Sequence, residues 1–189
     1  MREVYDANVE RVEEWLPKLS GSQTNDLEAF LDNWKENKDR YEAVAKAADL
    51  PPELVAAIHW RESTADFSTY LHQGDPLGKP AVHEPTNIPV FSDWDAAAAH
   101  ALDSKSYVAE QLNIDNSTQE MAALATYAEY YNGLGYSYRD KPSPYVWAGT
   151  DQYKRGKYVS DGRYSKWTKD TQLGVVLMIQ GIRDLEATE

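Results

Sequence analysis

Residues 51–76 read PPELVAAIHWRESTADFSTYLHQGDP, and this stretch decides the fold that we expect for the chain. The two prolines open a helix, because the first helical turn tolerates proline, whose missing N–H would be unsatisfied there anyway. Apolar side chains then recur along the helix, which predicts that it faces the core. These side chains are Leu54, Val55, Ile58 and Trp60.

Glu62 stands at the end of this apolar run, before the turn-rich segment QGDP at 73–76. At the end of a buried helix, desolvation disfavours the charged form of a carboxyl group and keeps a proton available near neutral pH. A general acid needs such a proton. The alternative interpretation is that Glu62 only faces solvent at a helix terminus.

Helical patterns cover most of the rest of the chain. The segment 64–92 loses helical periodicity and carries four prolines and two glycines, which predicts a long loop that could include a small hairpin. A tyrosine-rich irregular stretch follows at 134–166. The polar run 36–40 either breaks the second helix or forms its wet face. Residues 117–120, STQE, match a capping box. The expected helices span about 3–16, 25–48, 52–63, 92–102, 118–131 and 169–186.

These patterns predict a mainly α fold in one domain over residues 1–189, with N-terminal helices over about 1–50 and a catalytic core over about 51–189. Of the residues, 42% are hydrophobic and 12% aromatic, which excludes a disordered chain. We expect the two long loops, one irregular or containing a hairpin and one aromatic, to face a common groove.

Charge and composition exclude several classes of function. The formal net charge of −12 disfavours a nucleic-acid partner. The absence of cysteine excludes thiolate metal sites, disulfides and cysteine nucleophiles, and the four histidines lack ligand spacing, so we expect neither metal nor cofactor. No signal peptide is visible and no apolar run approaches membrane-spanning length, so we expect no membrane partner.

Two further features point to sugar chemistry. Asp75 lies on the irregular segment, where a hairpin folding back over the helix end would set its carboxylate across a groove from Glu62. Glycoside hydrolysis uses such a pair of carboxylates. The alternative for Asp75 is ordinary turn chemistry. Tyr131, Tyr145 and Trp147 supply flat rings with polar tips, which suit sugar faces, although such rings can equally anchor a long loop to the core.

The order RES at 61–63, QGD at 73–75 and YNG at 131–133 resembles the goose-type lysozyme and soluble lytic transglycosylase group. The longer strings HWRES at 59–63 and LHQGDPL at 71–77 are similar to phage and bacterial peptidoglycan hydrolases of this type. YNGLGY at 131–136 and SPYVW at 143–147 share this similarity. The Gly-Leu-Met-Gln segment common in the group is absent after Asp75, where KPAVHEP stands at 79–85.

The resemblance implies a lysozyme-like helical domain in which Glu62 is the catalytic acid and Asp75 positions water. Ser63 would support the groove near the cleaved bond, and Tyr131 and Asn132 would line the site. The implied partner is the glycan strand of peptidoglycan. We expect a monomer that acts on the cell wall, outside the cell or in the periplasm. Without a visible signal peptide, it would reach the wall either as a phage-encoded protein released from the cytoplasm or by another export route.

Three functions stay open at this point. A hydrolase would cut the β-1,4 bond between N-acetylmuramic acid and N-acetylglucosamine with water, and Asp75 favours it slightly. A lytic transglycosylase would form a 1,6-anhydro product with one carboxyl group. A non-catalytic glycan-binding module is the third, although the presence of Glu62 argues against it. The basic cluster KRGK at 154–157 is either a solvated turn or a contact for peptide-stem carboxylates.

Overall fold

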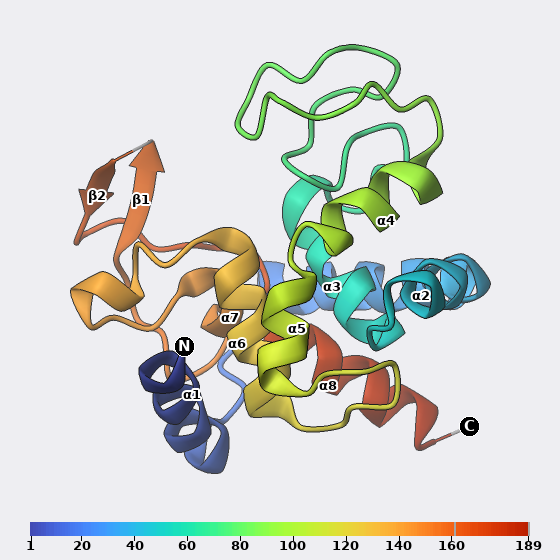
Figure 1. Ribbon diagram of the computed structural model, residues 1–189. Coiled ribbons are helices and arrows are strands. Elements are labelled where there is room, and N and C mark those ends of the chain that lie inside the picture. Colours follow the sequence, from blue (N-terminus) through green and yellow to red (C-terminus); the bar gives the residue numbers. More distant parts are fainter. Residues whose placement is uncertain (161, 189) are drawn as a thin grey trace. The chain divides into compact units, whose positions relative to one another are not determined.

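The computed structural model describes residues 1–160 and 162–188, and over these residues the chain is mainly helical. It forms eight α-helices and one two-stranded antiparallel sheet within those ranges (Figure 1), which confirms the predicted mainly α class. Contacts divide the chain into two compact units. We call Asn33–Gln119 the loop unit, and Met1–Asp32 with Glu120–Glu189 the hairpin unit. The expectation of one catalytic domain stays a prediction, and Asp161 and Glu189 lie outside the described residues.

The loop unit is built on α3 (Pro52–Ser63), whose predicted bounds are confirmed. Six consecutive residues of this helix, 54–59, have no exposed surface. Because six residues span more than one helical turn, α3 is buried on all sides and not along a single stripe. The unit also contains the second part of α2 (Gly21–Ala48), which runs unbroken through the polar residues 36–40. Helices α4 (Trp94–Asp103) and α5 (Ser106–Leu112) complete it, and α5 was not predicted.

Aromatic rings fill the core of the loop unit beside α3. Tyr41 from α2 lies at the centre, with its ring centroid 5.9 Å from that of His59 and 6.0 Å from that of Trp94. Tyr41 Oη and His59 Nδ1 lie 3.0 Å apart, and Asn33 donates a second hydrogen bond to Tyr41 at 3.0 Å. Burial lowers the pKa of His59 to about 4, so this histidine is neutral at pH 7.

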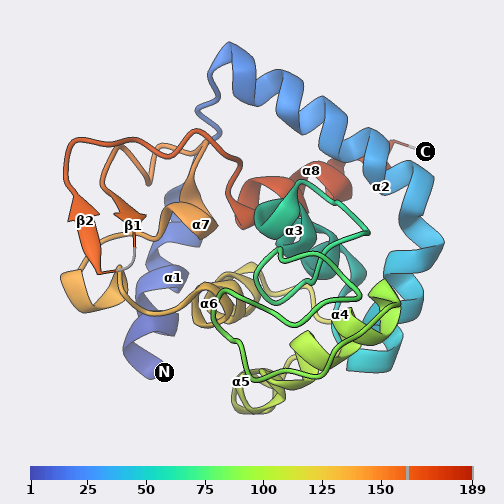
Figure 2. The ribbon, with the colours of Figure 1, turned by 90° about the horizontal axis from the view of Figure 1, so that it is seen from above.

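The hairpin unit packs α1 (Arg2–Glu14) against α6 (Met121–Asn132), and packs both α6 and the short α7 (Pro144–Trp147) against α8 (Val175–Glu186). After α7 the chain forms a hairpin of β1 (Lys157–Ser160) and β2 (Arg163–Ser165) (Figure 2). Tyr158 lies opposite Tyr164 in this hairpin. A 3₁₀ turn, η1 (Ser137–Arg139), precedes α7.

The predicted capping box is wrong. Ser117 and Thr118 instead form a turn in which their side chains bond to Asp115, which uses up the hydroxyl groups that the helix cap would need. The helix therefore begins later, at Met121, and Glu120 precedes it without a side-chain cap.

The last helix also begins later than predicted, at Val175 and not at 169. Residues 170–174 are held in an extended path because Asp170 accepts from the Gln172 amide at 3.1 Å and the Gly174 amide donates to Ala148 at 2.8 Å. A side chain at Gly174 would lie 2.5 Å from the Val146 carbonyl oxygen, so this close approach requires glycine. The segment 64–92 is mostly irregular, but it contains one antiparallel bridge between Thr69 and Pro76, in keeping with the small hairpin considered there.

Candidate functional site

Glu62 lies on the last turn of α3, half-buried, with Ser63 as the final residue of the helix. The chain then leaves the helix through two consecutive residues in the left-handed region, Thr64 (φ 55°) and Ala65 (φ 58°). Residues with side chains seldom adopt this conformation, and such strained backbone gathers at functional sites. The helix end that carries Glu62 is closed by this left-handed cap, in which the Thr64 amide donates to the Trp60 carbonyl at 2.9 Å.

The loop after α3 returns to Glu62. Gly74 has φ 80°, and a Cβ atom on it would lie 3.0 Å from the Glu62 carbonyl oxygen. Only glycine combines this conformation with so close an approach. The Gly74 amide also donates to the Tyr70 carbonyl at 2.8 Å, which closes the turn. The structure thus brings Gly74 against the end of α3, so the loop returns to the helix end; a groove between Asp75 and Glu62 stays a prediction.

Asp75 organises this loop from inside. Its side chain is 5% exposed, one carboxylate oxygen accepts from the amides of Val82 (2.7 Å) and His83 (2.9 Å), and the other lies 2.6 Å from His83 Nδ1. Burial alone would raise the pKa of Asp75, but the hydrogen bonds from His83 and Val82 together outweigh it and lower the pKa. Asp75 is therefore an ionised anchor whose two oxygens are both occupied.

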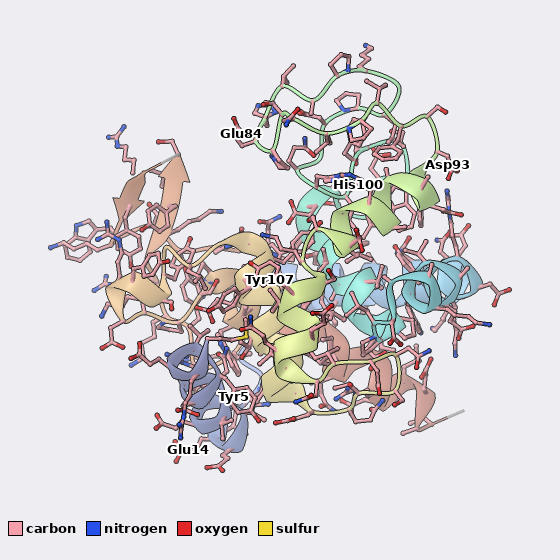
Figure 3. All side chains as sticks on the ribbon, in the orientation of Figure 1. Tyr5, Glu14, Glu84, Asp93, His100 and Tyr107 are labelled. Atoms are coloured by element: carbon pink, nitrogen blue, oxygen red, sulfur yellow. The ribbon has the colours of Figure 1, made fainter. Side chains whose placement is uncertain are left out.

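Two further side chains of the loop, Tyr70 and His72, hold it in place. The buried Tyr70 hydroxyl donates to the Lys79 carbonyl at 2.9 Å and accepts from the Phe91 amide at 3.0 Å. His72 Nε2 lies 2.9 Å from Nδ1 of His100, which stands on α4 facing the loop (Figure 3). Burial, and secondarily the charge of His100, lowers the pKa of His72 to about 4. The loop is thus held in a defined conformation by hydrogen bonds of its own side chains.

The other predicted site residues belong to the hairpin unit. Tyr131 and Asn132 are the last residues of α6, half-buried and exposed respectively, before Gly133 at φ 107°. Tyr145 and Trp147 are buried in α7, and the Trp147 indole donates to Asn8 at 3.1 Å. Their burial favours the interpretation that these two rings anchor the loop to the core. A groove shared by the two units stays a prediction.

Glu129 is a candidate that the sequence analysis missed. Its side chain is 2% exposed on α6, and burial raises its pKa, against the smaller opposing effects of a hydrogen bond from Asn8 and the charge of Arg11. It lines a cavity of about 480 Å³ together with Arg11 and Tyr130. The sequence feature that could have indicated Glu129 is its position in EYYN at 129–132, directly before the YNG motif at 131–133. A buried carboxyl group whose pKa is raised and that lines a cavity is a candidate proton donor.

Among the described residues, no three or more His, Cys, Asp or Glu side chains are grouped so as to hold a metal ion. Within the same ranges, every helix is too short or too polar to cross a membrane. Comparison of the chain with protein-family models, with curated proteins and with solved structures gave no match.

Proposed function

We propose that this protein is a lysozyme-like peptidoglycan hydrolase that cuts the β-1,4 bond between N-acetylmuramic acid and N-acetylglucosamine with Glu62 as the general acid. The observation that supports the proposal most is the fit of Gly74 against the Glu62 carbonyl oxygen at the end of the buried helix α3. This contact joins RES and QGD, two of the three motifs on which the family resemblance rests.

In the proposed reaction the Glu62 carboxyl group gives its proton to the glycosidic oxygen as the bond to the anomeric carbon breaks. Positive charge develops on the sugar ring, and the Glu62 carboxylate that remains stabilises it. Water then adds to the anomeric carbon and returns a proton to Glu62, which restores the enzyme. Ser63, the residue after Glu62, would contact the sugar next to the acid, since its side chain is half-buried.

A lytic transglycosylase is the second candidate, and the surroundings of Asp75 favour it. Both oxygens of Asp75 accept hydrogen bonds from the loop, so orienting a water molecule would require one of these bonds to break. A transglycosylase needs no second carboxylate. The C6 hydroxyl of the muramic acid attacks the anomeric carbon and passes its proton to the Glu62 carboxylate, which yields a 1,6-anhydro sugar.

Mass spectrometry of peptidoglycan digests made by the unmodified protein and by Glu62→Gln tests the proposal. Reducing-end muropeptides that disappear in the variant identify a hydrolase. Products lighter by one water identify a transglycosylase and leave Asp75 as a loop anchor. Glu129→Gln serves as the matched carboxyl control, and loss of cleavage in Glu129→Gln with retention in Glu62→Gln would move the acid to α6. A protein that binds but never cleaves peptidoglycan would be a glycan-binding module.

A further inference from the structure

A second site stands out in the hairpin unit, at the β-hairpin. A groove of about 540 Å³ is lined almost entirely by cationic and aromatic side chains. We call it the cationic groove; its lining residues are Arg139, Arg163, Tyr164, Ser165, Lys166 and Trp167. None of these residues is used by the proposed reaction, and all belong to the hairpin unit, whereas Glu62 belongs to the loop unit.

The charge around the cationic groove is opposite to that of the chain. Residues 154–169 contain six basic residues and one acidic residue, a net charge of +5, in a chain whose net charge is −12. Within this segment Lys157 is neutralised by Asp170 at 3.3 Å. Within residues 1–160 and 162–188, by contrast, Arg139, Arg163 and Lys166 have no ion-pair partner. Three cations therefore remain available to an anion.

Rings hold several of these cations in place. The Arg139 guanidinium lies 4.7 Å from the centroid of Tyr164, and its Nε donates to the Tyr158 hydroxyl at 2.9 Å. Arg155 and Lys166 lie 4.7 Å and 4.9 Å from the ring of Trp167. Such contacts restrict long side chains before a ligand arrives, which lowers the entropy cost of binding. Guanidinium groups so positioned suit carboxylates, which they bind in a bidentate manner.

The scaffold beneath the cationic groove is also fixed. The rings of Tyr136, Tyr158 and Tyr164 form a cluster with centroids 5.1 to 6.3 Å apart. The Tyr158 amide donates to the Tyr136 hydroxyl and the Tyr158 hydroxyl donates to the Gly135 carbonyl, each at 3.0 Å. These bonds tie the hairpin to the segment after α6, so the cations at its surface keep their spacing without a ligand.

We propose that the cationic groove binds the carboxylates of an anionic sugar polymer, namely the stem-peptide carboxylates of peptidoglycan. The choice of polymer rests on the proposed function. Trp167, whose side chain is 64% exposed, adds a flat apolar surface beside the cations that suits a sugar ring. Outside residues 154–169 the chain has a net charge of −17, which repels a dense polyphosphate such as nucleic acid more strongly than a polymer whose carboxylates are more widely spaced.

The test is co-sedimentation with insoluble peptidoglycan, using Glu62→Gln as the background so that cleavage does not remove the ligand. Arg163→Gln with Lys166→Gln removes two exposed cations that make no hydrogen bond among the described residues, so folding is preserved. We expect the double variant to bind peptidoglycan about tenfold more weakly than the background protein. Raising the salt concentration should weaken the binding of the background protein in the same way. The matched control, Lys18→Gln with Lys46→Gln, removes two exposed cations elsewhere and leaves binding unchanged.

A second arm uses peptidoglycan whose carboxylates have been amidated, and we expect it to bind as weakly as the double variant does to the native polymer. Equal binding of the double variant and the control, or equal binding to amidated and native peptidoglycan, would overturn the proposal. Tighter binding to a single-stranded oligonucleotide than to peptidoglycan would assign the groove to nucleic acid instead. Binding without any cleavage by the unmodified protein would remove the proposed function and leave this site intact.

Discussion

Replacing Asp75 tests the role of this residue as the anchor of the loop. Its carboxylate accepts two backbone amides at 2.7 and 2.9 Å and faces His83 Nδ1 at 2.6 Å. Hydrogen bonds to a charged group contribute about 1.5–3 kcal/mol each, and most of the cost of losing one comes from donors left without water. Val82 and His83 are exposed, so water can reach both amides. We therefore expect Asp75→Ala to lower the free energy of unfolding by about 2–3 kcal/mol.

Asp75→Asn is the finer test, because its amide oxygen can still accept both backbone amides while its NH₂ group faces the histidine ring. Only the charge is lost, and we expect a cost of about 1 kcal/mol. The assay is urea unfolding at pH 7 together with limited proteolysis of 76–90. Glu84→Gln removes a charge from the exposed part of the same loop and should change stability by less than about 0.5 kcal/mol.

The same variants predict a pH dependence. Because the pKa of Asp75 lies below its ordinary value of 3.8 in the folded protein, its contribution to stability is fully present above that value. The contribution is lost as the pH falls through the folded value, where the unmodified protein and Asp75→Asn should converge. An Asp75→Ala protein as stable as the unmodified one, with a protease-resistant loop, would refute the anchoring role.

Three further perturbations have defined outcomes. Asn8→Ala removes a fully buried hydrogen-bonding hub between α1, α6 and α7 and should cost about 2–4 kcal/mol in urea unfolding; an unchanged midpoint would contradict this. The pKa of His72 is lowered, so stability should fall as the pH drops from 6.5 towards 4, and His72→Phe should flatten that slope. In Gly74→Ala the new Cβ atom meets the Glu62 carbonyl oxygen, so we expect this variant to lose both stability and activity. In Gly78→Ala, at φ 77°, the new Cβ atom meets nothing within 4 Å, so we expect a loss of only about 1 kcal/mol in the free energy of unfolding. Equal effects of the two substitutions would contradict the fit of Gly74 against Glu62.

The sequence predicts the central helix well because two signals agree there. Pro51 and Pro52 mark the start and the apolar run fills the interior, and the structure has the helix at Pro52–Ser63. The contact between Gly74 and Glu62 is also consistent with the predicted return of the loop. Local signals misled where another local structure competes, as at Thr118, whose hydroxyl bonds to Asp115 in a turn instead of capping α6.

The surroundings of the candidate site could not be predicted from local patterns. The partners of Asp75 are the amides of Val82 and His83, and no periodicity shows which loop amides turn inward. The buried Trp147 indole finds its hydrogen-bond partner in Asn8, which lies 139 positions away in the chain. The cationic groove could not be predicted either, because it depends on the register of the hairpin. This register sets Tyr158 opposite Tyr164, and Arg139 lies over the Tyr164 ring.

The central claim is that Glu62 is the general acid, and the most direct measurement is the rate of dye release from labelled peptidoglycan by the unmodified protein and by Glu62→Gln. General acid catalysis contributes about 10²–10⁴-fold, so we predict at least a hundredfold loss with unchanged thermal stability and unchanged co-sedimentation. A Glu62→Gln protein that retains activity within a few-fold, or an unmodified protein that releases no dye from several wall types, would contradict the claim.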